Sequence, residues 1–159
     1  MAAISGTTTP TLLPLGSDET VGRTGFTHKL TVNYTDLTGG TSSGTATTYD
    51  VFTVSQYDLL ADVTFKVVTA FTGGSLSAAT VTAGDQTTAN LFATTGNSIF
   101  TAVSSYGQGA QNGGYFFTSS STTFRLTFTP TSDSWSNATA GQVVIYFRFL
   151  PYAVAGYIL

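Results

Sequence analysis

The stretch FRLTFTPTSDSWSNATAGQVVIYFRF (residues 124–149) contains two runs of alternating residue type that are joined by a polar loop. Period-two alternation is typical of β-strands, because successive side chains of a strand point to opposite faces. The second run is apolar on both faces. One face carries Val143, Ile145, Phe147 and Phe149, and the other carries Gln142, Val144, Tyr146, Arg148 and Leu150. This strand is therefore predicted to have one face in the core and the other against a second surface.

Similar runs recur along the chain and are separated by turn sequences rich in Gly, Asn and Asp. No window has a sustained 3.6-residue period. The helical candidate is a turn near residues 55–63, where Leu59 and Leu60 would cap the core. The strands are predicted at 28–37, 47–55, 62–71, 76–83, 89–94, 99–105, 114–120, 122–130 and 142–152. This pattern predicts an all-β fold, an antiparallel β-sandwich of jelly-roll type, as one domain over residues 27–159.

The first 26 residues differ from the rest because they lack this periodicity. They contain Pro10 and Pro14 and several Thr and Gly residues, so they are predicted to form an extended N-terminal arm. Leu12, Leu13 and Leu15 are apolar and need cover. We expect the arm to lie along its own domain or along a neighbouring subunit.

Charged residues are scarce in this chain. They make up 8% of it, against roughly a quarter in a typical soluble domain. Five Lys and Arg residues and a net charge of −3 provide no basic patch for nucleic acid. A surface with so little charge has weak long-range repulsion, which favours self-association or a permanent partner.

The N-terminus and the hydropathy indicate where the protein is made. MAAISGTTTPTLLPLGSDE has neither a basic n-region nor an apolar h-region, and no apolar run reaches about 18 residues. We therefore expect no signal peptide, no membrane span and synthesis in a host cytoplasm. The absence of cysteine excludes disulfides and thiolate metal sites.

Catalytic chemistry would have to use eight acidic residues and one histidine. The acids are Asp18, Glu19, Asp36, Asp50, Asp58, Asp62, Asp85 and Asp133. Most lie at predicted strand ends or turns, where Asp accepts hydrogen bonds from backbone amides. Asp58 and Asp62 could bind calcium together with Asp50 or Asp85, but no calcium-loop motif surrounds them. No catalytic motif surrounds His28 either, so the sequence predicts no enzyme, no cofactor and no metal.

Aromatic residues offer two interpretations. Trp135 lies in the loop 131–141 and is predicted to fold back as a plug at the end of the sandwich. The alternative is a solvent-facing platform of Tyr106, Tyr115 and Trp135 on which a sugar ring could stack.

The strand at 142–150 is also predicted to be an interface. If residues 124–130 pair with it directly, Arg125 falls near Arg148 on its second face, and two adjacent cations need a carboxylate between them. Asp62 or a neighbouring subunit could supply it. Val144, Tyr146 and Leu150 lie beside the arginines, and a mixture of Tyr, Arg and aliphatic residues is typical of interface cores. The competing interpretation is that the strand's own chain covers this face.

Four segments follow one another in the chain: DVTFKVVTAFTGG (62–74), ATVTAGDQTTANLF (79–92), a Gly-rich aromatic stretch, and TFRLTFTPTSDSWSNATAGQVVIYFRF (123–149). Their order resembles that in a family of small β-sandwich virion proteins of tailed bacteriophages. Gly84, Asp85, Thr87 and Ala89 match a G-D-x-T-x-A-type turn. The resemblance spans residues 28–150 and does not extend to the arm or to the C-terminal YAVAGYIL.

The resemblance implies a non-enzymatic capsid decoration (cement) protein, often a homotrimer, that binds a major capsid protein in the virion. It carries no catalytic residues. The alternative from a different class is a glycan- or receptor-binding module, such as a tail-fibre tip or a carbohydrate-binding domain. A third hypothesis, glycan cleavage through Asp85 and Asp133, is the weakest of the three.

Overall fold

The computed structural model describes residues 12–14, 26–37, 42–56, 58–92, 97–100, 105–108, 115–116 and 122–150. Ten strands and two short 3-10 turns are formed by these residues. The strands are β1 (Leu12–Pro14), β2 (His28–Asn33), β3 (Thr47–Val54), β4 (Leu59–Thr72), β5 (Ala78–Gly84), β6 (Asn97–Ser98), β7 (Ser105–Gln108), β8 (Tyr115–Phe116), β9 (Thr122–Thr131) and β10 (Ala140–Leu150). The 3-10 turns are η2 (Tyr34–Leu37) and η4 (Trp135–Asn137).

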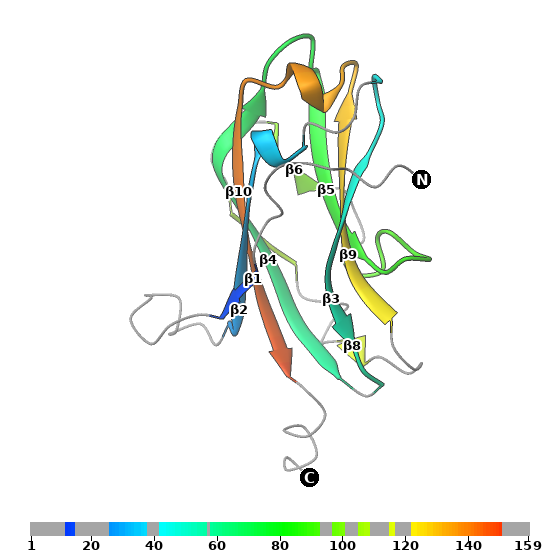
Figure 1. The fold of residues 1–159 in the computed structure, drawn as a ribbon. Helices are drawn as coiled ribbons and strands as arrows, with labels where there is room; N and C mark the ends of the chain where they lie inside the picture. Colours follow the sequence, from blue (N-terminus) through cyan, green and yellow to red (C-terminus); the bar gives the residue numbers. More distant parts are fainter. Residues whose placement is uncertain are drawn as a thin grey trace.

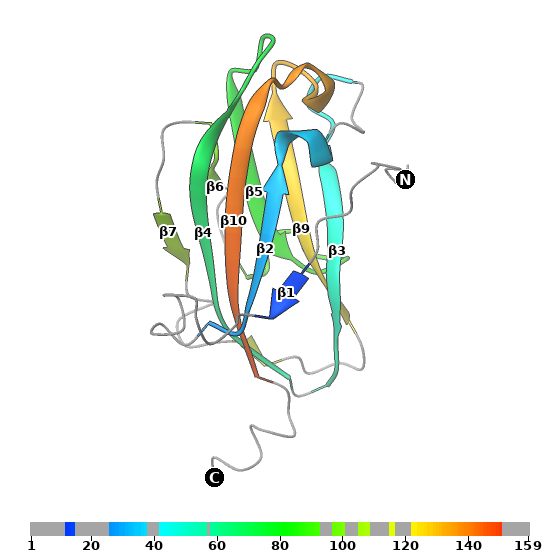
Figure 2. The ribbon, with the colours of Figure 1, turned by 60° about the vertical axis from the view of Figure 1, so that its left-hand side comes forward.

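The strands form two layers (Figures 1 and 2). Sheet A has the order β1-β2-β10-β4-β7, with β8 also paired to β4, and sheet B has the order β3-β9-β5-β6. Every strand pair in these sheets is antiparallel. This arrangement confirms the predicted all-β antiparallel sandwich.

Strand pairing is nested along the chain. β5 pairs with β6, β4 with β7, β3 with β9 and β2 with β10, and successive pairs of this series lie in alternate sheets. The β4–β10 and β5–β9 pairings then join the nested pairs within each sheet. Each successive pair in this series joins strands that are farther apart in the chain. Most tertiary contacts are therefore made between residues that are distant in sequence.

The core lies between the sheets and is built from the inward side chains of the alternating strands. Every second residue is buried from Phe124 to Pro130 on β9 and from Gly141 to Phe147 on β10, as the alternation predicts. Phe124 and Phe147 face each other across the two sheets, with ring centroids 5.2 Å apart and an angle of 89° between the rings. Phe52 stacks on Phe124 at 4.9 Å, so aromatic rings fill the centre of the sandwich.

The expected direct pairing of residues 124–130 with 142–150 is wrong. β9 pairs with β3 and β5 in sheet B, whereas β10 pairs with β2 and β4 in sheet A. Both runs have a fully apolar inner face. These faces bury more surface when they oppose each other across the core than when the strands lie side by side.

Several other boundaries differ from the prediction, and the strand predicted over 99–105 is wrong at its start, because β6 ends at Ser98, residues 99–100 are in no strand and β7 begins at Ser105. The expected helical turn at 55–63 is instead a tight turn that ends at Asp58, because β4 begins with Leu59. The Asp58 carboxylate accepts a hydrogen bond from the Ser55 amide at 2.7 Å. The strand predicted over 28–37 ends at Asn33, and η2 begins at Tyr34. Within the predicted strand 89–94, residues 89–92 form a turn and the rest lie outside the described residues.

Trp135 closes one end of the sandwich, as the plug interpretation requires. Its side chain is fully buried, its indole N–H donates to the carbonyl oxygen of Phe128 at 3.4 Å, and its ring lies edge-on to Phe71 at 5.9 Å. The residue therefore belongs to the core and does not present its ring to solvent.

We predict that Trp135→Ala lowers the free energy of unfolding by about 3–5 kcal/mol, the usual cost of deleting a buried aromatic side chain. Trp135→Phe should recover part of this loss, because a smaller ring still fills part of the site. Urea denaturation followed by circular dichroism measures both. Val68→Ala is the control, since Val68 is 38% exposed and should change stability by less than about 0.5 kcal/mol. Equal stability of Trp135→Ala and the control would contradict the plug.

Candidate functional site on the outer face of sheet A

The outer face of sheet A is the surface that the double-sided apolar strand β10 presents. Register places side chains of β2, β10 and β4 in rows across this face. The rows are Asn33–Gln142–Thr69, Thr31–Val144–Lys66, Lys29–Tyr146–Thr64 and, between β10 and β4, Arg148–Asp62. The face therefore mixes hydroxyls, amides and a few charges around a central line of apolar and aromatic residues.

The outer side chains of β10 are partly covered by their own chain. Phe26, just before β2, lies over Tyr146 with ring centroids 5.7 Å apart. Val144, Tyr146 and Leu150 remain half-buried and Arg148 is exposed. The competing interpretation, cover by the chain itself, thus holds in part at Tyr146.

The arginines of the predicted interface are separated, and their expected proximity is wrong. Because β9 lies in sheet B, Arg125 lies on the outer face of the opposite layer. There it forms two hydrogen bonds with Asp50, at 2.6 Å from Nε and 2.9 Å from Nη2. The hydrogen bond from Arg125 lowers the pKa of Asp50, and the exposed pair contributes about 0–1 kcal/mol. Arg148 faces Asp62 across the β4–β10 pairing, so the candidate carboxylate does lie opposite this arginine.

The arm residues of the prediction meet the same sheet. Leu12 and Leu13 lie in β1, which pairs with β2 through Leu12↔Leu30, Leu13↔Lys29 and Pro14↔His28. Leu15 lies outside the described residues. Part of the arm therefore extends sheet A of its own domain.

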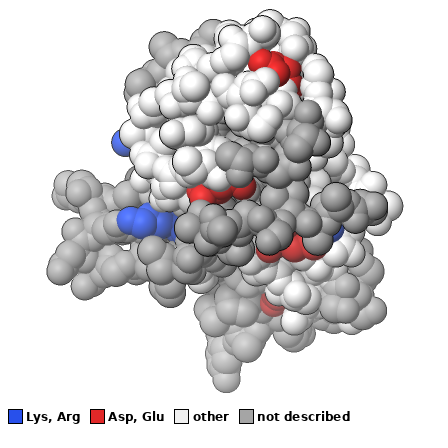
Figure 3. Space-filling model, turned by 45° about the horizontal axis from the view of Figure 1, so that its top comes forward, with Lys and Arg blue, Asp and Glu red and all other residues white. Residues whose placement is uncertain are grey.

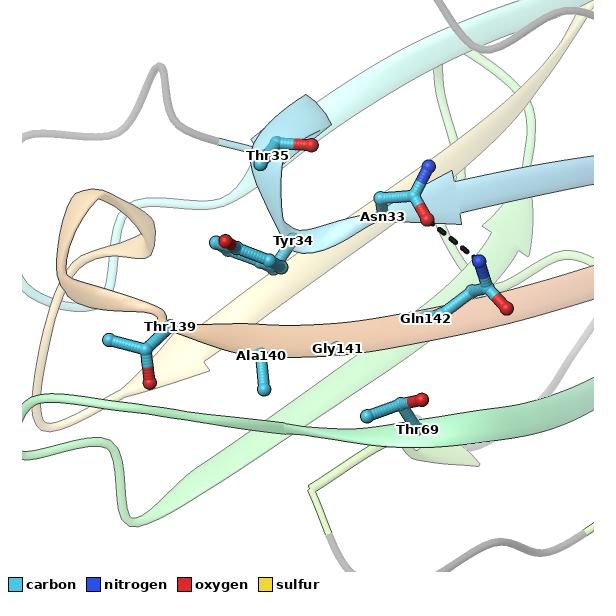
Figure 4. Close-up of a pocket in the computed structure, with 8 residues that line it drawn as sticks. All are labelled: Asn33, Tyr34, Thr35, Thr69, Thr139, Ala140, Gly141 and Gln142. Atoms are coloured by element: carbon cyan, nitrogen blue, oxygen red, sulfur yellow. Dashed lines mark hydrogen bonds between the residues drawn. The ribbon is translucent and has the colours of Figure 1, made fainter.

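At one end of this face lies an open hollow of about 360 Å³ (Figure 4). It lies beside η2, the blue coil at the top of Figure 1. Residues of β10 and its preceding loop form the floor, η2 forms one wall and β4 the other. The lining residues are Asn33, Tyr34, Thr35, Thr69, Thr139, Ala140, Gly141 and Gln142.

Two local features produce this hollow. First, β2 leaves the sheet after Asn33, the last residue of β2 paired with β10. Second, the β10–β4 register shifts between Ala140 and Gln142, so that Ala140 is opposite Thr72 and Gln142 is opposite Thr69. Such irregularities bend strands and re-aim side chains next to binding sites. Gly141 lies at the shift with φ +148°, and a Cβ there would overlap the ring of Phe71.

A buried carboxylate orders the amides of the hollow. Asp36, 5% exposed, accepts hydrogen bonds from the Asn33 backbone amide at 2.7 Å and from Asn33 Nδ2 at 3.3 Å. Gln142 Nε2 in turn donates to Asn33 Oδ1 at 2.9 Å. Tyr49 of sheet B donates its hydroxyl to the Asp36 carbonyl oxygen, and burial followed by the Asp36 charge raises the pKa of Tyr49. The wall of the hollow is therefore tied to both sheets.

None of the hollow's residues was predicted from the sequence to bind a ligand, and Gln142 was placed only on the second face of its strand. A signal was present, because Asp36 follows Asn33 by three residues at the end of a strand run, and such spacing is typical of side-chain-capped turns. The distant partners Thr69 and Gln142 could not be inferred, because strand register brings them to Asn33.

The predicted glycan platform is not assembled. Trp135 is buried, whereas β7 and β8, which contain Tyr106 and Tyr115, pair with β4 and their side chains lie outside the described residues. β8 pairs with the first residues of β4, Leu59 and Leu60. The chain after η4 contacts the opposite end of β4, where the Thr139 amide donates a hydrogen bond to the Thr72 carbonyl oxygen. The platform prediction is therefore wrong for Trp135.

The G-D-x-T-x-A-type turn has a structural explanation. Asp85 accepts hydrogen bonds from the backbone amides of Thr87 at 2.7 Å and Thr88 at 2.6 Å, and a Cβ at Gly84 would overlap the carbonyl oxygen of Thr88. Within the part of the chain that the structure describes, no group of three or more His, Asp or Glu side chains could hold a metal ion.

Comparison with known proteins adds no relative. No family model matches the chain, and searches of curated proteins and of solved structures found no match. Among the described residues, no helix has the length and apolar character needed to cross a membrane.

The loop that leads into the floor of the hollow is fixed by Asp133. Its carboxylate accepts hydrogen bonds from the Ser75 amide at 2.6 Å, from the Asn137 side-chain amide at 2.7 Å and from the Ser134 amide at 2.8 Å. These bonds, that from Ser75 foremost, lower the pKa of Asp133. Asp133 therefore joins the β4–β5 turn to the β9–β10 connection through its charged form.

We predict that Asp133→Asn lowers the melting temperature at neutral pH, and that the difference from the parent protein shrinks as the pH falls below about 4. A lowered folded-state pKa stabilises the fold above the unfolded value of about 3.9, and this contribution is lost as the pH falls through the folded pKa. Calorimetry between pH 7 and pH 2.5 measures the difference.

Asn137→Ala is the matched control for this experiment. It removes one donor and keeps the carboxylate, so it should lower the melting temperature less. A difference between parent and Asp133→Asn that is the same at every pH would show that the charge of Asp133 plays no part.

Proposed function

We propose that this protein is a non-enzymatic structural component of a phage particle, of the capsid decoration (cement) type. In this proposal it forms a homotrimer and binds a major capsid protein through the outer face of sheet A. The observation that carries the proposal is the outer row of β10. There Val144, Tyr146 and Leu150 are only half-buried in the single chain, between the Thr and Lys residues of β2 and β4 and beside the Arg148–Asp62 row.

The strand order supports this proposal by fold-level analogy. We infer that the nested pairing, with successive pairs in alternate sheets, is the jelly-roll arrangement. Jelly rolls occur in viral capsid proteins and in lectins. Because one fold serves many functions, the face of β10 must carry the specific argument.

The physics of a shell favours a face of this kind. Burial of apolar surface contributes about 25 cal/mol per Å², so a few hundred Å² per contact gives a modest energy. Repetition of that contact over a multivalent assembly makes the total binding strong. The low charge of the chain lets copies approach each other without strong repulsion.

The proposal predicts a trimer in solution, with a mass three times the 16.5 kDa of the chain. Val144→Glu should shift it towards the monomer, because the new carboxylate would lose its water when the face is covered. The substitution should not destabilise the fold of the single chain, since the new carboxylate would lie opposite Lys66. Light scattering coupled to size exclusion measures the mass.

Thr129→Glu is the matched control, because it places the same charge on the outer face of sheet B. It should leave the trimer intact. A monomeric parent protein at all concentrations, or equal effects of the two substitutions, would overturn the proposal. A version that lacks residues 1–26 should form a weaker trimer if the arm also clasps a neighbour.

A further inference from the structure

We propose that the hollow beside η2 binds a neutral saccharide. This site goes beyond the proposed assembly role: it lies on the same outer face of sheet A, at the end where β2 has left the sheet. Its volume of about 360 Å³ falls in the lower part of the range of roughly 300–1,000 Å³ that is usual for small-molecule sites.

The side chains of the hollow define the chemistry of the ligand. They comprise two amides, three threonine hydroxyls and one phenol, and no Asp, Glu, Lys or Arg lines the site. Figure 3, which brings the top of the sandwich forward, shows only scattered charged atoms among the described residues of that face. A ligand charge would therefore meet no counter-charge, whereas a ring with many hydroxyls finds both donors and acceptors.

Several polar groups of the hollow remain available to a ligand. The Oε1 atom of Gln142 and the hydroxyls of Tyr34 and Thr69 accept or donate no hydrogen bond within the described part of the chain. They come from β10, η2 and β4 and line the same hollow, with the Tyr34 hydroxyl towards the Thr139 end and the Gln142 side chain at the other end (Figure 4). The Tyr34 ring and the Ala140 methyl group lie in the same space and provide an apolar surface for the C–H face of a sugar ring.

The amides are also oriented before any ligand arrives. The hydrogen bonds from Asp36 through Asn33 to Gln142 fix the orientation of both amides, and the Oε1 atom of Gln142 is left pointing away from Asn33 (Figure 4). The hydrogen bond from the Asn33 backbone amide to Asp36 is sufficient to cap the turn. The ordering of the two side-chain amides is therefore an additional effect of this carboxylate. Such prior ordering reduces the entropy lost on binding.

The test is a titration of the ¹⁵N-labelled full chain with neutral sugars, followed by NMR. The probes are the methyl glycosides of glucose, galactose, mannose and N-acetylglucosamine and their β-linked disaccharides, with glucuronic acid as the charged comparison. We expect at least one neutral sugar to shift the side-chain amide signals of Asn33 and Gln142, with a dissociation constant on the order of 1 mM.

Substitutions then locate the binding. Thr69→Val keeps the side-chain shape and removes one hydroxyl, so it should weaken binding about threefold to tenfold, the range for one hydrogen bond. Tyr34→Ala should weaken it further. Thr129→Val on sheet B is the matched control and should leave binding unchanged.

Three results would overturn the inference. The first is the absence of any shift of the NMR signals with neutral sugars up to about 50 mM, well above the expected dissociation constant. The second is unchanged affinity in Thr69→Val. The third is tighter binding of glucuronic acid than of every neutral sugar. A trimer that fails to bind sugar, or a monomer that binds it, would separate this inference from the proposed assembly role.

Discussion

Packing between β9 and β10 across the core is the constraint on which the rest of the structure depends. Each strand is the central partner of two others in its own sheet, and Phe124 and Phe147 hold the two sheets together at their centre. The nested order brings strands from the two ends of the chain into contact, so local hydrogen bonding cannot define it. A cluster of aromatic rings compensates for the entropy that these long loop closures cost.

Much of the fold could be predicted from the sequence because alternation is a local property. β3 and β9 were predicted to within one residue at each end and β10 to within two at its start, since the alternation of residue type marks where these runs lie. The pairing of the strands could not be predicted in the same way. The segment between β9 and β10 crosses from sheet B to sheet A, and its local sequence does not distinguish this crossing from a polar loop between paired strands.

The candidate site illustrates the same limit. The apolar outer row of β10 was evident in the sequence, because it depends on the identity of alternate residues. The hollow was not, because it depends on a register shift and on the end of β2, which bring Asn33, Gln142 and Thr69 together from three strands. The Arg125–Asp50 pair was missed for the same reason, since β3 and β9 are distant in sequence.

The short edge strand β1 has a consequence for how copies of the chain could associate. It forms one edge of sheet A, opposite the edge at β7, it spans three residues, and one of them is Pro14. Proline lacks the amide hydrogen that a further strand would need, and short edges with proline discourage open-ended strand addition. Growth into fibres is thus disfavoured at this edge, and contacts between copies are directed to the faces of the sandwich, where an assembly can close on itself.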